Sequence, residues 1–197
     1  MRATPPADIQ ALEDALGAAE RDARALLSGL TEGLGGWRAD PGAWSVAECL
    51  DHLATANRVY LRAMQPAADN AVAEGRWRRR PAKPGVIGGW FVRTLEPPVT
   101  PRFSVKAPAK IRPRVSPTLG DAAAQFLASQ GDVRQFLQTY AGIDLAGVRF
   151  PNPLVRGVRF SLATGLHAIA AHERRHLWQA WRVRQAAERA ASRISDQ

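Results

Sequence analysis

Two histidines, His172 and His176, stand four residues apart in the segment AHERRHLWQ at 171–179. In a helix this spacing places both side chains on one face, with their Cβ atoms about 6 Å apart. Two imidazole nitrogens at that separation can bind one metal ion at about 2.0–2.1 Å each. The pair therefore predicts part of a divalent metal site. The alternative is a pair of histidines whose ring nitrogens are satisfied by neighbouring carbonyl groups.

A third histidine, His52, lies one turn after Cys49 in the segment WSVAECLDHL at 44–53. If this segment is a helix that packs against the helix of His172 and His176, three imidazoles can meet in the core of a helical bundle. Three histidine ligands leave a position open for water or substrate, which is the arrangement of a reactive site. Cys49 could be a fourth ligand, but free cysteines are among the most buried residues, so we interpret it as apolar core.

The later histidine segment also matches the peptidase pattern HExxH, in which the glutamate is a general base. Glu173 is therefore a candidate outer partner of the ligands or a base, with a salt bridge to a neighbouring arginine as the alternative. The extended pattern fails, because Gln179 stands where it requires glycine. A peptidase whose third ligand is a glutamate on a later helix is also disfavoured, because only 21 residues follow His176. Gln179 could instead orient bound solvent. His167 lies five residues before His172, so we place it on another face in a structural or surface role.

Four amphipathic helices are expected to position these residues. Apolar side chains recur at three- and four-residue spacings in four segments of the chain. The predicted helices cover 7–30, 45–65, 118–140 and 161–189. Ser45 and Glu48 have the spacing of a capping box, and Pro66 is expected to end that second helix. Thr118 is expected to cap the third helix, and the glycine-rich run at 33–36 to end the first.

We predict an all-α fold without strand pairs: a four-helix bundle that forms one domain over 1–197, with a long Pro- and Arg-rich connection between its second and third helices. This connection, at about 76–117, contains eight prolines and, up to Arg114, eleven basic residues against one acid, Glu96. The rest of the chain has sixteen basic and seventeen acidic residues. The whole excess of positive charge therefore lies in the connection, where the prolines predict irregular chain with a short helical turn at about 88–95.

The two histidine segments together resemble the DinB-like superfamily, bacterial four-helix bundles related to thiol-dependent S-transferases. The resemblance extends over about residues 9–190 and implies an up-up-down-down bundle, often a homodimer. It also implies a divalent metal ion on His52, His172 and His176, zinc in preference to nickel, iron or manganese. The implied reaction is metal-dependent transfer of a low-molecular-weight thiol cosubstrate to a small molecule. The basic connection departs from the minimal bundle and leaves the substrate open.

Other functions remain compatible with the sequence. A metal-dependent hydrolase would use the same three ligands. The segment RWRRR at 76–80 interleaves Trp77 with arginines, as single-strand binders do, so a non-catalytic module that binds nucleic acid or a protein is an alternative, although no recognised nucleic-acid module accompanies it. The alternative is a solvated loop that folds Trp77 or Trp90 onto the bundle. As a third interpretation, the basic connection lines the mouth of the site and attracts an anionic substrate.

The cellular location follows from what the sequence lacks. The single cysteine cannot form an internal disulfide, and the N-terminal segment has no apolar run typical of a signal peptide. No window approaches 18 unbroken apolar residues, so we predict no membrane span. The expectation is a cytoplasmic protein with no membrane partner.

Overall fold

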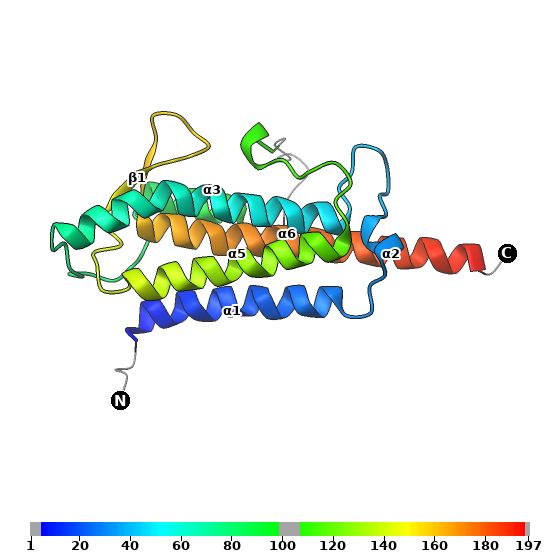
Figure 1. Cartoon of the computed structure of the whole chain (residues 1–197), viewed down its shortest axis with the longest axis horizontal. Helices are drawn as coiled ribbons and strands as arrows, with labels where there is room; N and C mark the ends of the chain where they lie inside the picture. The colour runs from blue at the N-terminus through cyan, green and yellow to red at the C-terminus, as the bar shows by residue number, and fades with distance from the viewer. Residues whose placement is uncertain (1–4, 99–106, 196–197) are drawn as a thin grey trace.

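The computed structural model describes residues 5–98 and 107–195 and is mostly helical (Figure 1). Four long helices lie side by side: α1 (Ala7–Leu27), α3 (Val46–Ala73), α5 (Leu119–Tyr140) and α6 (Leu162–Ser195). Helices α1 and α3 each contact both α5 and α6. The all-α fold class is confirmed. Within the described residues, no helix combines the length and hydropathy needed to cross a bilayer.

Helices α1 and α6 run in one direction, and α3 and α5 in the other (Figure 1). The parallel course of α3 and α5 is shown by two contacts, from Arg58 to Gln125 and, further along both helices, from Gln65 to Tyr140. The order is thus up-down-down-up, and the expected up-up-down-down order is wrong. The reason is the length of the connections. The short one after α1 reverses the chain, whereas the long one after α3 returns it to the end where α3 began.

The two predicted helix caps are confirmed. At the start of α3, Ser45 Oγ accepts a hydrogen bond from the Glu48 backbone N–H at 3.1 Å, and Glu48 Oε2 accepts one from the Ser45 N–H at 2.9 Å. At the start of α5, Thr118 Oγ1 accepts from the Asp121 N–H at 3.3 Å. Both helices therefore begin where local side-chain chemistry satisfies their free backbone donors.

Pro66 does not end α3, which corrects the prediction. The residue lies inside the helix, and α3 continues to Ala73. A proline inside a helix removes one backbone hydrogen bond and costs about 3 kcal/mol. Here Met64 precedes Pro66, and Ala68 and Ala71 follow it, all buried in the core. Burial on both sides of the proline therefore favours an unbroken helix.

Two further elements differ from the predictions. A short hairpin pairs β1 (Arg149–Pro151) with β2 (Arg159–Ser161) in antiparallel register, although no strands were predicted. Phe150 and Phe160 are opposite each other and buried, but strands of three residues are too short to show an alternating pattern. The glycine-rich run, expected only as a break, lies in the short helix α2 (Glu32–Gly36).

The core consists of two apolar clusters separated by polar residues. One cluster surrounds Leu50, Phe126 and Leu177, and the other includes Val133 and Phe150. On α3, α5 and α6, the residues between these clusters include buried polar side chains: Asn57, Ser129, Gln130 and Glu173. The bundle therefore carries a polar layer across its middle, close in sequence to the histidines.

Much of the connection between α3 and α5 is ordered against the bundle. The predicted turn is the helix α4 (Val86–Leu95), which packs on α6. A short 3-10 helix, η2 (Ala109–Ile111), packs on α3. Arg102 and Lys106, which belong to the predicted basic connection, lie outside the described residues. The connection thus contacts the bundle at two places, through α4 on α6 and through η2 on α3.

Neither tryptophan side chain of the connection is buried on the bundle, which corrects the solvated-loop interpretation, although the backbone of Trp77 pairs with that of Ile143. Trp77 is 57% exposed and Trp90 is 62% exposed. Helix α4 is attached instead by Phe91, whose ring lies 4.9 Å from that of Phe160 between centroids. The outer face of α4 is therefore left to solvent.

The close approach of α4 to α6 depends on Gly88, and substitution there is expected to destabilise the protein. A Cβ atom at Gly88 would lie 2.4 Å from Thr164 Oγ1, whereas one at Gly89 would meet no atom within 4 Å. We expect Gly88→Ala to lower the free energy of unfolding by about 1–3 kcal/mol through overpacking. The matched control Gly89→Ala should leave it unchanged or raise it by up to about 1 kcal/mol. Urea denaturation measures both, and equal losses would contradict the contact.

Candidate metal centre

Three histidines converge where α3 and α6 pack side by side, running in opposite directions (Figure 1). His52 comes from α3, and His172 and His176 come from α6. One ring nitrogen of each lies within 4.8 Å of the other two, and the Nε2 atoms of His52 and His172 are 3.1 Å apart. Ligand nitrogens around a tetrahedral ion with bonds of about 2.0–2.1 Å are about 3.4 Å apart. The structure therefore brings together all three histidines that the sequence selected, and the His52–His172 distance is close to that expected for two ligands of one ion.

Two outer partners fix the orientation of the rings. His52 Nδ1 donates a hydrogen bond to the backbone carbonyl of Ile111 in η2. His176 Nδ1 donates to Gln179 Oε1 at 2.9 Å. Because carbonyl oxygens only accept, both Nδ1 atoms carry a proton and both Nε2 atoms are left with a lone pair that can bind a metal ion. Such outer partners orient metal-binding histidines in proteins. The sequence offered Gln179 as a residue that could orient bound solvent, and Ile111 was not predicted at all.

The three rings are held neutral at physiological pH. Burial lowers the pKa of His52, lowers that of His172 well below its usual range, and lowers that of His176 to about 3. Trp44 covers the cluster, with its ring centroid 4.7 Å from that of His52 and 5.7 Å from that of His176. Neutral imidazole is the form that binds metal ions, so no proton has to leave these rings before binding.

Arg175 places a positive charge beside the cluster. It follows His172 by three residues, and its charge helps to lower the pKa of all three histidines. Its Nη1 donates to the Thr94 carbonyl at 3.2 Å, and burial lowers the pKa of Arg175 itself. Its neighbour Arg174 pairs with Glu96, but among the described residues Arg175 pairs with no carboxylate. The site therefore contains a partly buried cation without an anionic partner.

Glu173 lies in the polar layer, where neither of its predicted roles is fulfilled. The side chain is fully buried, and its two oxygens accept hydrogen bonds from Asn57 Nδ2 at 2.8 Å and Gln130 Nε2 at 2.7 Å. Burial raises its pKa to about 8. A carboxyl group that is engaged inside the bundle and protonated at neutral pH is a poor general base for water. This geometry disfavours the peptidase interpretation, and the salt bridge to a neighbouring arginine does not form among the described residues.

The remaining candidates lie outside the cluster. Cys49 is fully buried among apolar side chains, and burial raises the pKa of its thiol, so it stays protonated. The metal-ligating group in the described chain does not include it. His167 is half-buried, and its Nε2 donates to the Ala82 carbonyl at 3.1 Å. The apolar interpretation of Cys49 and the structural interpretation of His167 agree with these positions.

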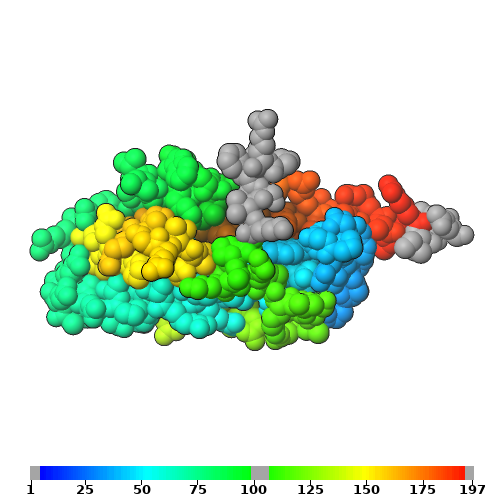
Figure 2. Space-filling model, turned by 90° about the horizontal axis from the view of Figure 1, so that it is seen from above, coloured from blue at the N-terminus to red at the C-terminus, as the bar shows by residue number. Residues whose placement is uncertain are grey.

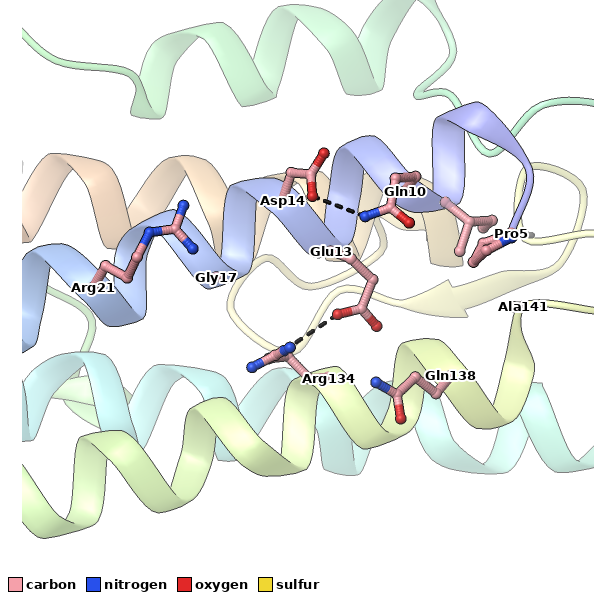
Figure 3. Close-up of a pocket in the computed structure, with 10 residues that line it drawn as sticks. Pro5, Gln10, Glu13, Asp14, Gly17, Arg21, Arg134, Gln138 and Ala141 are labelled. Carbon is pink, nitrogen blue, oxygen red and sulfur yellow. Dashed lines mark hydrogen bonds and ion pairs between the residues drawn. The ribbon is translucent and has the colours of Figure 1, made fainter. Parts of the chain in front are cut away.

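A pocket of about 490 Å³ lies elsewhere, between the start of α1 and the end of α5 (Figure 3). Its polar side chains are largely paired with each other: Glu13 binds Arg134 at 3.2 Å, and Gln10 binds Asp14 at 2.8 Å. None of its lining residues belongs to the histidine cluster. The pocket therefore adds no group to the site.

Comparison with known protein families identifies a match over most of the chain. A family model described as the DinB superfamily matches residues 15–180, a range that contains His52, His172 and His176. No curated protein matches the chain.

Proposed function

This chain belongs to the DinB superfamily, and on that premise we propose that it binds one divalent metal ion through His52, His172 and His176 and transfers a small thiol to an electrophile. The observation that carries the proposal is the convergence of three neutral imidazoles, two with Nδ1 protons tied to outer carbonyls. A divalent ion there supplies Lewis acidity that lowers the pKa of a bound thiol, and zinc suits both nitrogen and sulfur ligands. Nickel, iron and manganese are the alternatives.

The protein's own residues prepare the site for this reaction. Ile111 and Gln179 hold two of the rings, so that little ordering is needed on binding. Trp44 and the burial of His52, which is 1% exposed, limit access of water. In the transfer, the thiol gives its proton to solvent, and its sulfur forms a bond to an electrophilic carbon. The leaving group departs with the electron pair of the bond that breaks.

We propose that the thiol or its acceptor is anionic, because Arg175 offers a cation without a carboxylate partner. Replacement of Arg175 by glutamine should raise KM for a carboxylate-bearing thiol about 10- to 100-fold, the loss of one charge-assisted hydrogen bond. The change should be smaller for the methyl ester of the same thiol. Arg189→Gln, on the exposed part of α6, is the matched control. A KM that rises equally for acid and ester would contradict this role.

Loss of the outer partner of His176 should weaken metal binding without removing it. We expect Gln179→Ala to lower zinc affinity about 10- to 100-fold, with one ion per chain still bound at saturation. Competition with a chelator of known affinity measures the change. Gln185→Ala, an exposed glutamine on the same helix, should bind as the wild type does. An affinity that is the same in both variants would show that the Gln179 contact does not orient the ligand.

The protein is further proposed to act in the cytoplasm as a homodimer. The reduced, buried Cys49 supports the location, and the resemblance to the family supports the dimer. Sedimentation equilibrium of the full chain measures the oligomeric state, with a mass of twice 21.4 kDa as the expected result. A mass of one chain at all concentrations would rule out the dimer.

The thiol chemistry can be tested separately from metal binding. Zinc-loaded protein is mixed with monochlorobimane and, in turn, cysteine, N-acetylcysteine or glutathione, and thioether formation is followed by fluorescence. We expect a rate gain over metal-free protein with at least one thiol. The visible spectrum of the cobalt-loaded protein should change on addition of that thiol. If metal binds but no thiol changes either readout, the transferase proposal fails while the metal site stands.

A further inference from the structure

We propose that α4 binds the surface of an anionic lipid bilayer, with its exposed apolar side chains inserted among the headgroups. This inference does not depend on the metal site. It revises the expectation of no membrane partner, which rested on the lack of a membrane span. The proposal rests on three observations: an apolar face without cover, a rigid attachment to the bundle and a surrounding set of unpaired cations.

The apolar face consists of Val86, Ile87 and Trp90. Their exposed fractions are 91%, 76% and 62%. Val86 and Trp90 are four residues apart and Ile87 and Trp90 three, so the three side chains share one side of the helix. The opposite side is the one that packs on the bundle, through Gly88 and Phe91. Packing within the described residues does not account for three exposed apolar side chains on one side of α4.

Helix α4, which carries the apolar face, is held in place on the bundle by three contacts. The close contact of Gly88 with Thr164, the Phe91–Phe160 ring contact and the Glu96–Arg174 ion pair all anchor α4. Figure 2 shows α4, in green, standing out from the body of the molecule. A projecting helix can enter a headgroup layer as interfacial helices do.

The charges around α4 select an anionic partner. Arg93 follows Trp90 by three residues on the same side of the helix, and Arg79 and Lys83 precede α4. All three are exposed and form no ion pair with the described residues, in contrast to Arg78 and Arg80, which pair with aspartates.

A second copy of the chain docked symmetrically on this face would oppose like charges, which is unfavourable. An anionic bilayer matches both the cations and the apolar face of α4. The cations bind headgroups, and the tryptophan and aliphatic side chains enter the interface. An exposed apolar patch framed by cations therefore fits a bilayer better than it fits a further protomer.

The test is co-sedimentation of the full chain with vesicles of phosphatidylcholine alone or with 30% phosphatidylglycerol. We expect binding to the anionic vesicles only, weakened by salt, with a blue shift of tryptophan fluorescence. The double variant Ile87→Ser/Trp90→Ser should reduce the affinity at least tenfold. The matched control Val115→Ser/Val155→Ser, two exposed apolar residues outside α4, should bind as the wild type does.

A second variant and three further measurements complete the test. Lys83→Glu/Arg93→Glu should also reduce the affinity at least tenfold, and circular dichroism should show both α4 variants folded. Undiminished vesicle binding by either variant, or no binding by the wild type, would overturn the proposal. So would loss of a dimer in the Ile87/Trp90 variant, which would identify a second copy as the occupant. Tighter binding of a single-stranded oligonucleotide than of vesicles would identify nucleic acid instead.

Discussion

His172→Ala is expected to abolish stoichiometric metal binding. The wild-type protein, purified without added metal and then dialysed against zinc, should hold about one ion per chain. In the variant only two imidazoles remain, and the Nε2 atom that lies 3.1 Å from His52 Nε2 is missing. Loss of a ligand should lower the zinc affinity by more than loss of an outer partner does, which is about 10- to 100-fold. Elemental analysis after gel filtration measures the metal content.

His167→Ala is the matched control for this experiment. It removes a histidine from the same helix, and the ring it removes binds the Ala82 carbonyl outside the cluster. The control should retain one ion per chain, and His52→Ala should behave as His172→Ala does. Metal content that is unchanged in both cluster variants would refute the three-histidine site.

Glu173→Gln is expected to make the metal-free protein more stable at alkaline pH. The pKa of Glu173 is raised from 4.5 to about 8 because the carboxyl group is fully buried. The unfolded chain releases this proton near its normal pKa, whereas the folded chain keeps it. The stability that depends on this group is therefore present below pH 4.5 and is lost as the pH rises to about 8. At about 1.4 kcal/mol per pKa unit, the loss reaches an upper bound on the order of 5 kcal/mol.

Glutamine does not titrate, so the variant should lack this loss. Asn57 Oδ1 and Gln130 Oε1 are buried without a hydrogen-bond partner, and a rotated amide can accept a hydrogen bond from the side-chain N–H that the substitution introduces. Denaturation of both proteins in a chelator at pH 5 and pH 9 tests this. The two should be within about 1 kcal/mol at pH 5 and differ by several at pH 9. Glu74→Gln, an exposed control, should follow the wild type, and parallel curves for Glu173→Gln would contradict the assignment.

The sequence predicted those features that depend on local chemistry. The caps at Ser45 and Thr118 follow from interactions within one helical turn, and the i, i+4 spacing of His172 and His176 places them on one side of a helix. His52 could be selected as the third ligand because few other roles account for a histidine on the inner face of a facing amphipathic helix. These predictions needed only residue type and spacing.

Features that depend on tertiary contacts could not be predicted. Pro66 stays helical because residues on both sides of it are buried, which no local pattern reveals. The partner of His52 Nδ1 is the backbone carbonyl of Ile111, and every residue has such a group. The polar layer that takes up Glu173 requires residues from α3 and α5 that lie far apart in sequence. The HExxH pattern therefore suggested that Glu173 is a base, whereas the fold buries its carboxyl group.

A crystal structure of the zinc-loaded protein, with anomalous diffraction recorded on both sides of the zinc edge, tests the central claim most directly. The predicted result is one anomalous peak between the three imidazoles, about 2.0–2.1 Å from one ring nitrogen each of His52, His172 and His176. A zinc peak at any other place in the chain, with the three histidines unbound, would contradict the account.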